Sequence, residues 1–289
     1  MAFPISNVVK YAPIVNFHPD EEFFPIDPMD FISKSRFRHH RVGKDEGYDK
    51  TKDKWVKTNS QETNYYDIPV DFIDKFRVWG RRNRRPHDSA SGDHWNVFLQ
   101  TRKKEKGVPD PDSKIPVFYY VKRTDTTEFA ETARKQFNIQ PEINYKIQYW
   151  WFFGYNNGPA TQNHQGDWEH VTVRLDEDAN IQGVYFAAHG KPKFVKKNEL
   201  KFSNDHCNVC IAKGTHAAYE KAGDFPLKVL GIKVADDNTR DNGNVWNTEL
   251  KLLSLRTQPW RYYAGAWGEV GELADTTGPL GPWHKKDKN

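Results

Sequence analysis

The segment NHQGDWEHVTVRL, residues 163–175, combines residue types that could form a chemical site. It carries two histidines, an aspartate and a glutamate within seven positions and then continues as a β-forming run. Carboxylate and imidazole side chains at this density could hold a divalent cation, transfer protons, or form a hydrogen-bonded polar plug at a sheet end. Which of these applies depends on the side chains that share a face.

Strand parity separates this segment into two sets of side chains. Alternate residues of a strand point to the same face, so Asp167 and Glu169 share a face with the valines and leucine that follow them. Trp168 and His170 fall on the opposite face, where a structural role is predicted for His170. Two carboxylates at the end of a core-facing surface are costly unless a cation or several hydrogen-bond donors balance them.

The following strand adds a histidine to the predicted site. The turn-forming sequence DEDAN directly after Leu175 predicts an antiparallel hairpin. The predicted register pairs Val171 with Tyr185 and places Asp167 opposite His189. A slip by one residue would send His189 to the other face.

These side chains form a predicted ligand set of His164, Asp167, Glu169 and His189. Oxygen-rich sets with one or two imidazoles suit Ca²⁺ first, with Mg²⁺ or Mn²⁺ as alternatives. In KGTHAAYE, a glycine and small alanines surround His216, which predicts a tight turn that brings this histidine close to another backbone. There His216 either joins the cluster or caps a loop.

The rest of the sequence predicts a mainly β, single-domain sandwich over residues 1–289, with a few peripheral helices and long loops. Aromatic residues make up 14% of the chain, which suits strands, and no linker divides it. The polar range 36–66 is predicted to be a loop-rich insertion. Predicted strands cover 8–18, 94–100, 115–123, 143–155, 168–175, 181–190, 207–212, 227–234 and 250–255, and predicted helices cover 69–80 and 127–137.

Composition excludes several classes of protein. A net charge of +4 is too small to indicate a nucleic-acid partner, although RRNRR at 81–85 could attract an anionic surface. No apolar run is long enough to span a membrane. The sequence shows no secretory signal, which predicts a cytoplasmic protein or export by a non-classical route. Cys207 and Cys210 lack a second ligand pair, so structural thiols are expected rather than a zinc site.

Several segments together resemble the vacuolar protein sorting-associated protein 62 family. The Gly-, Pro- and Trp-rich stretch 267–283 fits the same pattern. The resemblance covers most of the chain, but that family by itself implies little about activity. The segments that carry it are YAPIVNFHPDEEFFP (11–25), GDWEHVTVRL (166–175) with VYFAAHG behind it, and GTHAAYE (214–220).

A more distant similarity is to the necrosis- and ethylene-inducing-like proteins, carried by IQYWWFFGYNN, NHQGDWEHV and AAHG. These are secreted cytolysins with a lectin-like sandwich. The resemblance implies that Asp167 and Glu169 coordinate a divalent cation, usually Ca²⁺, which engages sphingolipid sugar headgroups. The first histidine of that family's hallmark matches His164 and its tryptophan matches Trp168.

Two departures from this family's pattern matter, one within its hallmark and one at an upstream ligand. Gln165 stands in place of its arginine and Gly166 in place of its second histidine. The upstream aspartate ligand of the family corresponds to Asn156. An amide oxygen coordinates Ca²⁺ without contributing charge, so weaker cation binding is implied.

Three functions follow as hypotheses. The first is a metal-dependent recognition protein, toxin- or effector-like, that binds lipid or carbohydrate headgroups with peripheral membrane contact and with Trp151, Trp168 and His216 among its binding residues. The second is a metal-dependent hydrolase with Glu169 as general base and His189 or His216 as acid. The third is an intracellular protein-sorting adaptor, which rests on the family resemblance alone.

Overall fold

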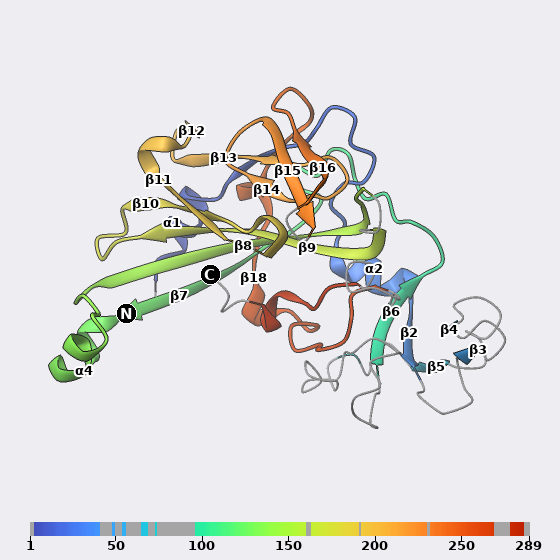
Figure 1. Cartoon of the computed structure of the whole chain (residues 1–289), viewed down its shortest axis with the longest axis horizontal. Coiled ribbons are helices and arrows are strands. Elements are labelled where there is room, and N and C mark those ends of the chain that lie inside the picture. Colours follow the sequence, from blue (N-terminus) through green and yellow to red (C-terminus); the bar gives the residue numbers. More distant parts are fainter. Residues whose placement is uncertain are drawn as a thin grey trace.

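The protein is a two-sheet β-sandwich with further β elements beside it (Figure 1). The computed structural model describes residues 3–40, 48–49, 54–55, 65–68, 73, 96–159, 163–190, 192–229, 232–268 and 278–285. The predicted mainly β sandwich with few helices is thereby confirmed. No helix in these ranges is both long enough and apolar enough to cross a membrane.

The larger sheet has six strands in the order β11-β10-β9-β8-β7-β18. Its centre is the long antiparallel pair β8 and β9, which carries the polar segment. The strands are β7 (Val117–Asp125), β8 (Ile143–Asn157), β9 (Asn163–Leu175), β10 (Ile181–Phe186), β11 (Lys193–Lys196) and β18 (Leu252–Ser254).

The second sheet has the order β12-β13-β1-β17, with β14 also paired to β13. Its central strand β1 runs parallel to β13, with Ile14 opposite Asn208, and antiparallel to β17. The strands are β1 (Ile14–Asn16), β12 (Phe202–Ser203), β13 (His206–Ile211), β14 (Ala218–Tyr219) and β17 (Val245–Asn247).

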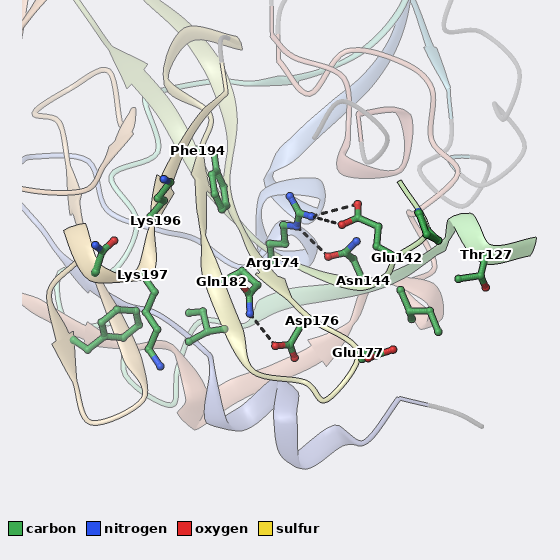
Figure 2. Close-up of a pocket in the computed structure, with 15 residues that line it drawn as sticks. Thr127, Glu142, Asn144, Arg174, Asp176, Glu177, Gln182, Phe194, Lys196 and Lys197 are labelled. Atoms are coloured by element: carbon green, nitrogen blue, oxygen red, sulfur yellow. Dashed lines mark hydrogen bonds and ion pairs between the residues drawn. The ribbon is translucent and has the colours of Figure 1, made fainter. Parts of the chain in front are cut away.

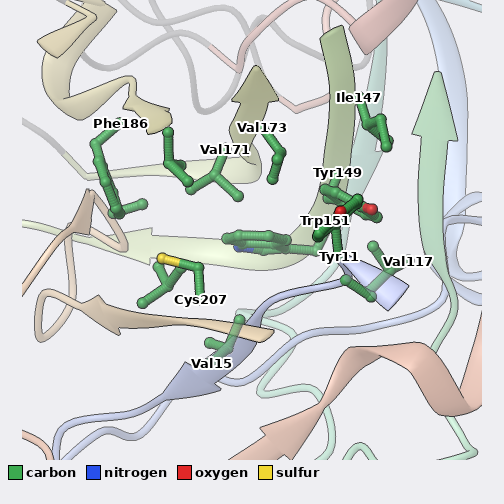
Figure 3. Close-up of a cluster of buried hydrophobic side chains, with 14 of the residues drawn as sticks. Tyr11, Val15, Val117, Ile147, Tyr149, Trp151, Val171, Val173, Phe186 and Cys207 are labelled. Atoms are coloured by element: carbon green, nitrogen blue, oxygen red, sulfur yellow. The ribbon is translucent and has the colours of Figure 1, made fainter. Parts of the chain in front are cut away.

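A hydrophobic core fills the space between the two sheets (Figure 3). Trp151, Val171 and Val173 of the larger sheet pack there with Val15 and Cys207 of the smaller one. The opposite face of β8 and β9 is covered too, by a second core that includes helix α2 (Pro28–Lys34) and the C-terminal tryptophans. Because both faces are buried, the middle of β8 reads as the continuous aromatic run YWWFFGY instead of an alternating pattern.

Smaller elements surround the sandwich. Strands β2 (Ser35–His40), β5 (Tyr65–Ile68) and β6 (Asn96–Thr101) form a three-stranded sheet, and β15 (Gly223–Val229) pairs with β16 (Ile232–Thr239). The pair β3 (Tyr48–Asp49) and β4 (Lys54–Trp55) is separate. The remaining helical segments are α1 (Ile5–Lys10), η2 (Thr126–Glu128), α4 (Glu131–Gln136), η3 (Ala188–Gly190), η4 (Lys197–Glu199), η5 (Thr248–Lys251), η6 (Leu255–Thr257) and η8 (Pro282–His284).

Three element predictions need correction. The predicted strand 8–18 begins instead with α1, whose Val8 is buried in the core, because packing outweighs the β propensity of its valines. The predicted loop 36–66 contains most of β2, whose polar residues pair with β6 on one side and β5 on the other. The predicted strand 227–234 covers parts of both β15 and β16.

Two other predictions fall largely outside the described residues. They are the helix 69–80, of which only buried Ile73 is described, and the arginine-rich segment 81–85. The predicted helix 127–137 is confirmed as η2 followed by α4.

Candidate functional site

The predicted division of β9 into two faces is correct. Asp167 pairs with Phe153 and Glu169 with Trp151, and both aromatic partners belong to the core between the sheets. Trp168 lies in the second core on the opposite face. The two carboxylates therefore lie at the end of a core-facing surface, as the parity argument required.

The predicted hairpin register is wrong by one residue over most of its length. Leu175 pairs with Ile181, but an irregularity between Ile181 and Gly183 then shifts the pairing, so that Val171 lies opposite Phe186 instead of Tyr185. A bulged residue cannot be seen in an alternating sequence pattern. As a result, His189 does not hydrogen bond to Asp167; its Nε2 lies 2.5 Å from Oδ2 of Asp237 on β16.

A buried histidine lies between two carboxylates at this end of the sandwich. His216 is 0% exposed, and its Nδ1 donates to Oδ2 of Asp167 at 3.1 Å. Its Nε2 lies 3.8 Å from Oε1 of Glu21, and its ring stacks on Phe153 with centroids 3.8 Å apart. Burial lowers the pKa of His216, but its hydrogen bond to Asp167 and the nearby charge of Glu21 outweigh burial and raise it to about 9. His216 is therefore an internal imidazolium at neutral pH.

The sequence around His216 folds into the predicted tight turn. Gly214 has φ +74°, and a Cβ there would meet the carbonyl oxygen of Asn157 at 2.5 Å. The Gly214 N–H donates to Oε2 of Glu21, while Oε1 accepts from the N–H groups of Glu22 and Phe23. Burial would raise the pKa of Glu21, yet His216 and these N–H groups hold it below its usual value. The turn thus joins His216 to the site and fixes its acidic partner.

Asp167 is held in place by donors on both sides. Besides His216, the amide of Asn156 donates to its Oδ2 at 3.2 Å. The amide oxygen of Asn156 accepts from the N–H of Gly158, which occupies one of its two acceptor positions. Burial would raise the pKa of Asp167, but His216 and His164 lower it, and the side chain is a carboxylate at neutral pH.

Glu169 is the open carboxyl of the site. Its side chain is partly exposed, and among the described residues no side-chain donor hydrogen bonds to it. Burial, followed by the charges of Asp167 and Asp237, raises its pKa well above the usual value. Asp167 and Asp237 therefore add negative charge around Glu169, which the charge of Lys285 offsets only in part.

Asp237 anchors a second hydrogen-bonded group beside Glu169. It is 1% exposed; its Oδ1 accepts from the Thr215 hydroxyl at 2.7 Å, and its Oδ2 accepts from Tyr219 at 2.6 Å as well as from His189. Burial would raise the pKa of Asp237, but His189, Tyr219 and Thr215 lower it. The His189 side chain is 32% exposed and so presents an oriented imidazole to solvent.

The departure of Gly166 from the hallmark has a steric reason. Gly166 has φ +65°, and a Cβ there would lie 1.7 Å from the carbonyl oxygen of Trp267. A histidine cannot fit in this position because the C-terminal segment packs directly on the backbone. Its neighbour His164 directs Nδ1 to the carbonyl oxygen of Gly166 at 2.8 Å.

The five predicted metal ligands are therefore only partly brought together. Asp167 and Glu169 lie two residues apart on one face, whereas His189 contacts Asp237. The oxygen of Asn156 accepts from the N–H of Gly158, and Nδ1 of His164 points to the carbonyl oxygen of Gly166. Within the described ranges, no three His, Cys, Asp or Glu side chains converge as the ligands of a preformed metal site. The donors that fit a cation here are the carboxylates of Asp167 and Glu169.

Both tryptophans predicted to contact a ligand are buried. Trp151 is 0% exposed between the sheets and Trp168 is 2% exposed in the second core, so neither offers a ring to a ligand. His170 stacks on Trp150 at 3.7 Å, and burial lowers its pKa to about 3, as expected for a structural histidine. Cys207 and Cys210 are free and buried, and burial raises their pKa values to about 12 and about 11.

Sequence reasoning missed two acidic members of the site, Glu21 and Asp237. Asp237 alternates with Ala235 and Thr239 on one face of β16, and a carboxylate on a strand face with small neighbours could have been noticed. Glu21 lies in the turn-rich stretch before α2, where no periodic pattern distinguishes it.

Comparison with known proteins places this site inside a recognised family region. The sequence model of the vacuolar protein sorting-associated protein 62 family matches residues 155–256. The resemblance predicted from the motifs is confirmed. The matched range contains Asp167, Glu169, His216 and Asp237 but not Glu21.

Two proteins of Saccharomyces cerevisiae (strain ATCC 204508 / S288c) are similar along nearly the whole chain. Vacuolar protein sorting-associated protein 62 is 21% identical and covers 91% of this chain and 59% of its own length. The putative vacuolar protein sorting-associated protein TDA6 is 24% identical and covers 97% of this chain and 66% of its own length. The chain thus spans about three fifths to two thirds of these relatives.

The structural neighbours are of the necrosis- and ethylene-inducing type. A structure described as NLPPya in complex with mannosamine has a TM-score of 0.38 at 14% identity, covering 92% of this chain and 81% of that one. The non-toxic HaNLP3 protein has a TM-score of 0.37 at 13% identity, covering 94% and 85%. Necrosis and Ethylene inducing Protein 2 from the causal agent of cocoa's Witches Broom disease has a TM-score of 0.34 at 13% identity, covering 89% and 75%.

Proposed function

We propose that this chain is a recognition protein that binds a divalent cation, Ca²⁺ before Mg²⁺ or Mn²⁺, through Asp167 and Glu169. The bound cation would in turn hold a hydroxylated headgroup of a lipid or glycan. The observation that carries the proposal is the position of Glu169, an open carboxyl next to Asp167 on the same strand face with Asp237 close by. A cation would relieve the charge that these three side chains concentrate.

The chemistry of the donors supports a hard cation. Carboxylate oxygens are preferred by Ca²⁺ and Mg²⁺. Ca²⁺ takes about six to eight oxygen ligands, so water molecules would fill the positions that the two carboxylates leave. The retained waters are the positions that sugar or lipid hydroxyls could replace. The cation would add positive charge to that of the buried His216 and of Lys285, which already act on Asp167.

The surrounding hydrogen bonds would prepare Asp167 for this role. His216 and Asn156 both bond to Oδ2, and no described residue hydrogen bonds to Oδ1. Groups that hold a ligand side chain from behind fix its orientation and raise metal affinity. Glu21 and the Gly214 turn would act one step further back by holding His216.

The test compares Ca²⁺ binding by the chelator-treated wild-type protein and by Glu169→Gln, using calorimetry. Wild type should bind Ca²⁺, and Glu169→Gln should weaken binding by at least about tenfold. Without Ca²⁺ the variant should melt at a higher temperature than wild type, because it removes a carboxyl whose charge is penalised. Flotation of the protein with glycolipid vesicles, once in Ca²⁺ and once in chelator, then tests whether the protein binds the headgroup through the cation.

Glu199→Gln is the matched control, since Glu199 is exposed in η4 on the β11 side of the sheet. It should bind Ca²⁺ like wild type. Equal binding of Ca²⁺ by wild type and Glu169→Gln would refute the proposed cation site. So would the absence of binding by either protein at about 1 mM Ca²⁺, the dissociation constant of the weakest protein calcium sites.

A second candidate function, hydrolysis, is favoured by the contact between His189 and Asp237. An exposed imidazole oriented by a buried carboxylate suits a general base, and Glu169 with its raised pKa suits a general acid rather than the base expected from the sequence. His216 is too buried to meet a substrate. Turnover of phosphodiester or glycoside substrates that is lost in His189→Gln would favour this function; inactivity of wild type on such a panel would reject it.

A further inference from the structure

A large groove lies at the other end of β9, where the hairpin between β9 and β10 meets β11 and the connection between β7 and β8 (Figure 2). It encloses about 940 Å³, a size suited to a small organic ligand. Asp167 and Asp176 are nine residues apart on or just after an extended strand, so the groove lies roughly 30 Å from the acidic site. The proposed cation site does not use any of its residues.

A row of basic side chains crosses this face of the sheet, and two of its members, Arg174 and Lys196, line the groove. Lys122 pairs with Lys146, and Lys146 pairs with Arg174, on the adjacent strands β7, β8 and β9. On β10 the row is occupied by Gly183, which lies between Arg174 and Lys196 of β11. Paired residues share a face, so four cationic side chains project from one side of five consecutive strands.

Such a row is unfavourable without a partner, because like charges directly opposite each other on neighbouring strands repel. Burial lowers the pKa of Lys146, and the charges of Lys122 and Arg174 lower it further. Glu142 balances Arg174 in part, at 3.1 Å, but its side chain is 47% exposed and such a pair contributes little. Among the described residues no carboxylate pairs with Lys196 or Lys197, which lie on one side of the groove in Figure 2, whereas its carboxylates Glu142, Asp176 and Glu177 lie on the other side. The lysine side is therefore where an anion could bind.

The groove also offers groups that suit hydroxyls and an apolar ring face. Phe194 lies between Arg174 and Lys196 in the view of Figure 2, and a Cβ at Gly183 would meet its ring at 2.6 Å, so the glycine makes room for the ring. Asn144 accepts from Nε of Arg174 at 3.1 Å, and Gln182 donates to Asp176 at 2.8 Å. These amides are fixed in place at the groove wall, where they can meet ligand hydroxyls.

We propose that this groove binds the phosphate ester of a small polyhydroxylated molecule, of the sugar phosphate class. Arg174 and Lys196 hold the phosphate, with Lys197 of η4 lining the same groove. The ring of Phe194 packs against the carbon face of the polyol, and the amides and the exposed carboxylate of Glu177 accept or donate to its hydroxyls. The site is independent of the proposed cation.

In the experiment, the whole chain is titrated in the presence of chelator with glucose 6-phosphate, glucose or inorganic phosphate. Calorimetry measures the binding. Glucose 6-phosphate should bind more tightly than either of the other two. The double variant Arg174→Gln/Lys196→Gln should weaken it by about tenfold or more, the effect of losing hydrogen bonds to a charged group. Lys114→Gln/Lys221→Gln, which removes the same charge from exposed lysines elsewhere, should bind like wild type.

Three results would overturn the proposal. One is equal binding of glucose 6-phosphate and glucose; another is equal weakening by both double variants, which would indicate net charge alone. The third is equal binding of glucose 6-phosphate and inorganic phosphate. Glu169→Gln should leave glucose 6-phosphate binding unchanged, so failure here and failure of the cation site give different results.

Discussion

The two ends of strand β9 differ in the sign of their charged side chains and in how far these are compensated. At its N-terminal end, Asp167 is buried and compensated by His216, inside a network closed by Glu21 and Asn156. At its C-terminal end, Arg174 is partly exposed and shares a row with other cations, with Glu142 as partial compensation. The buried charge of Asp167 is thus compensated within the protein, whereas the charge of Arg174 is compensated only in part by an exposed partner.

Removing His216 should give the largest effect, because two buried carboxylates would lose their counter-ion. We expect His216→Ala to lower the free energy of unfolding by about 3–5 kcal/mol, the usual result of removing one partner of a buried ion pair. Urea denaturation followed by tryptophan fluorescence measures this. A loss below about 1 kcal/mol, the range of exposed ion pairs, would show that the two ends do not differ as described.

The protonation of His216 gives a second test. Its pKa is raised from 6.5 to about 9, so its contribution to stability is complete below pH 6.5 and is lost as pH rises through 9. Nitrogen NMR of the histidine rings should show one imidazolium that persists to about pH 9, and stability should fall over the same range. Measurement in Glu169→Gln removes the contribution of that carboxyl. A ring with a midpoint at or below 6.5 would contradict the buried imidazolium.

The smallest effect is expected at the basic end. Arg174→Gln loses its bonds to Glu142 and Asn144 but also relieves repulsion from Lys146, so stability should change by less than about 1 kcal/mol in either direction. The same urea titration measures it. A loss comparable with that of His216→Ala would mean that Arg174 supports the fold instead of a ligand.

Local patterns predicted the acidic site well where a single strand determines it. The shared face of Asp167 and Glu169 follows from the period of two, and the turn at His216 follows from its glycine. The position of His189 depended on pairing across a hairpin, and one irregularity near Gln182 redirected it to Asp237. An error of one residue in the register moves every side chain of the strand to the other face, so a site predicted from that register fails completely.

Contacts between distant segments could not be predicted. Trp151 and Trp168 were predicted to contact a ligand, but both are buried. An aromatic residue in a strand sequence does not show whether its sheet face is exposed or covered. The covering of the second face by α2 and the C-terminal tryptophans decides this. Likewise, Glu21 reaches His216 only through the fold, and no spacing in the sequence relates them.

The position of β1 has a consequence for how the chain folds during synthesis. This strand lies near the N-terminus, yet both of its neighbours, β13 and β17, come from the last third of the chain. Val15 and Phe17 must therefore stay unpaired on the ribosome until most of the polypeptide has emerged, while β7 to β10 can already pair with one another. Closure of the sandwich is a late, long-range event, and its apolar first strand is the segment that depends longest on protection from aggregation.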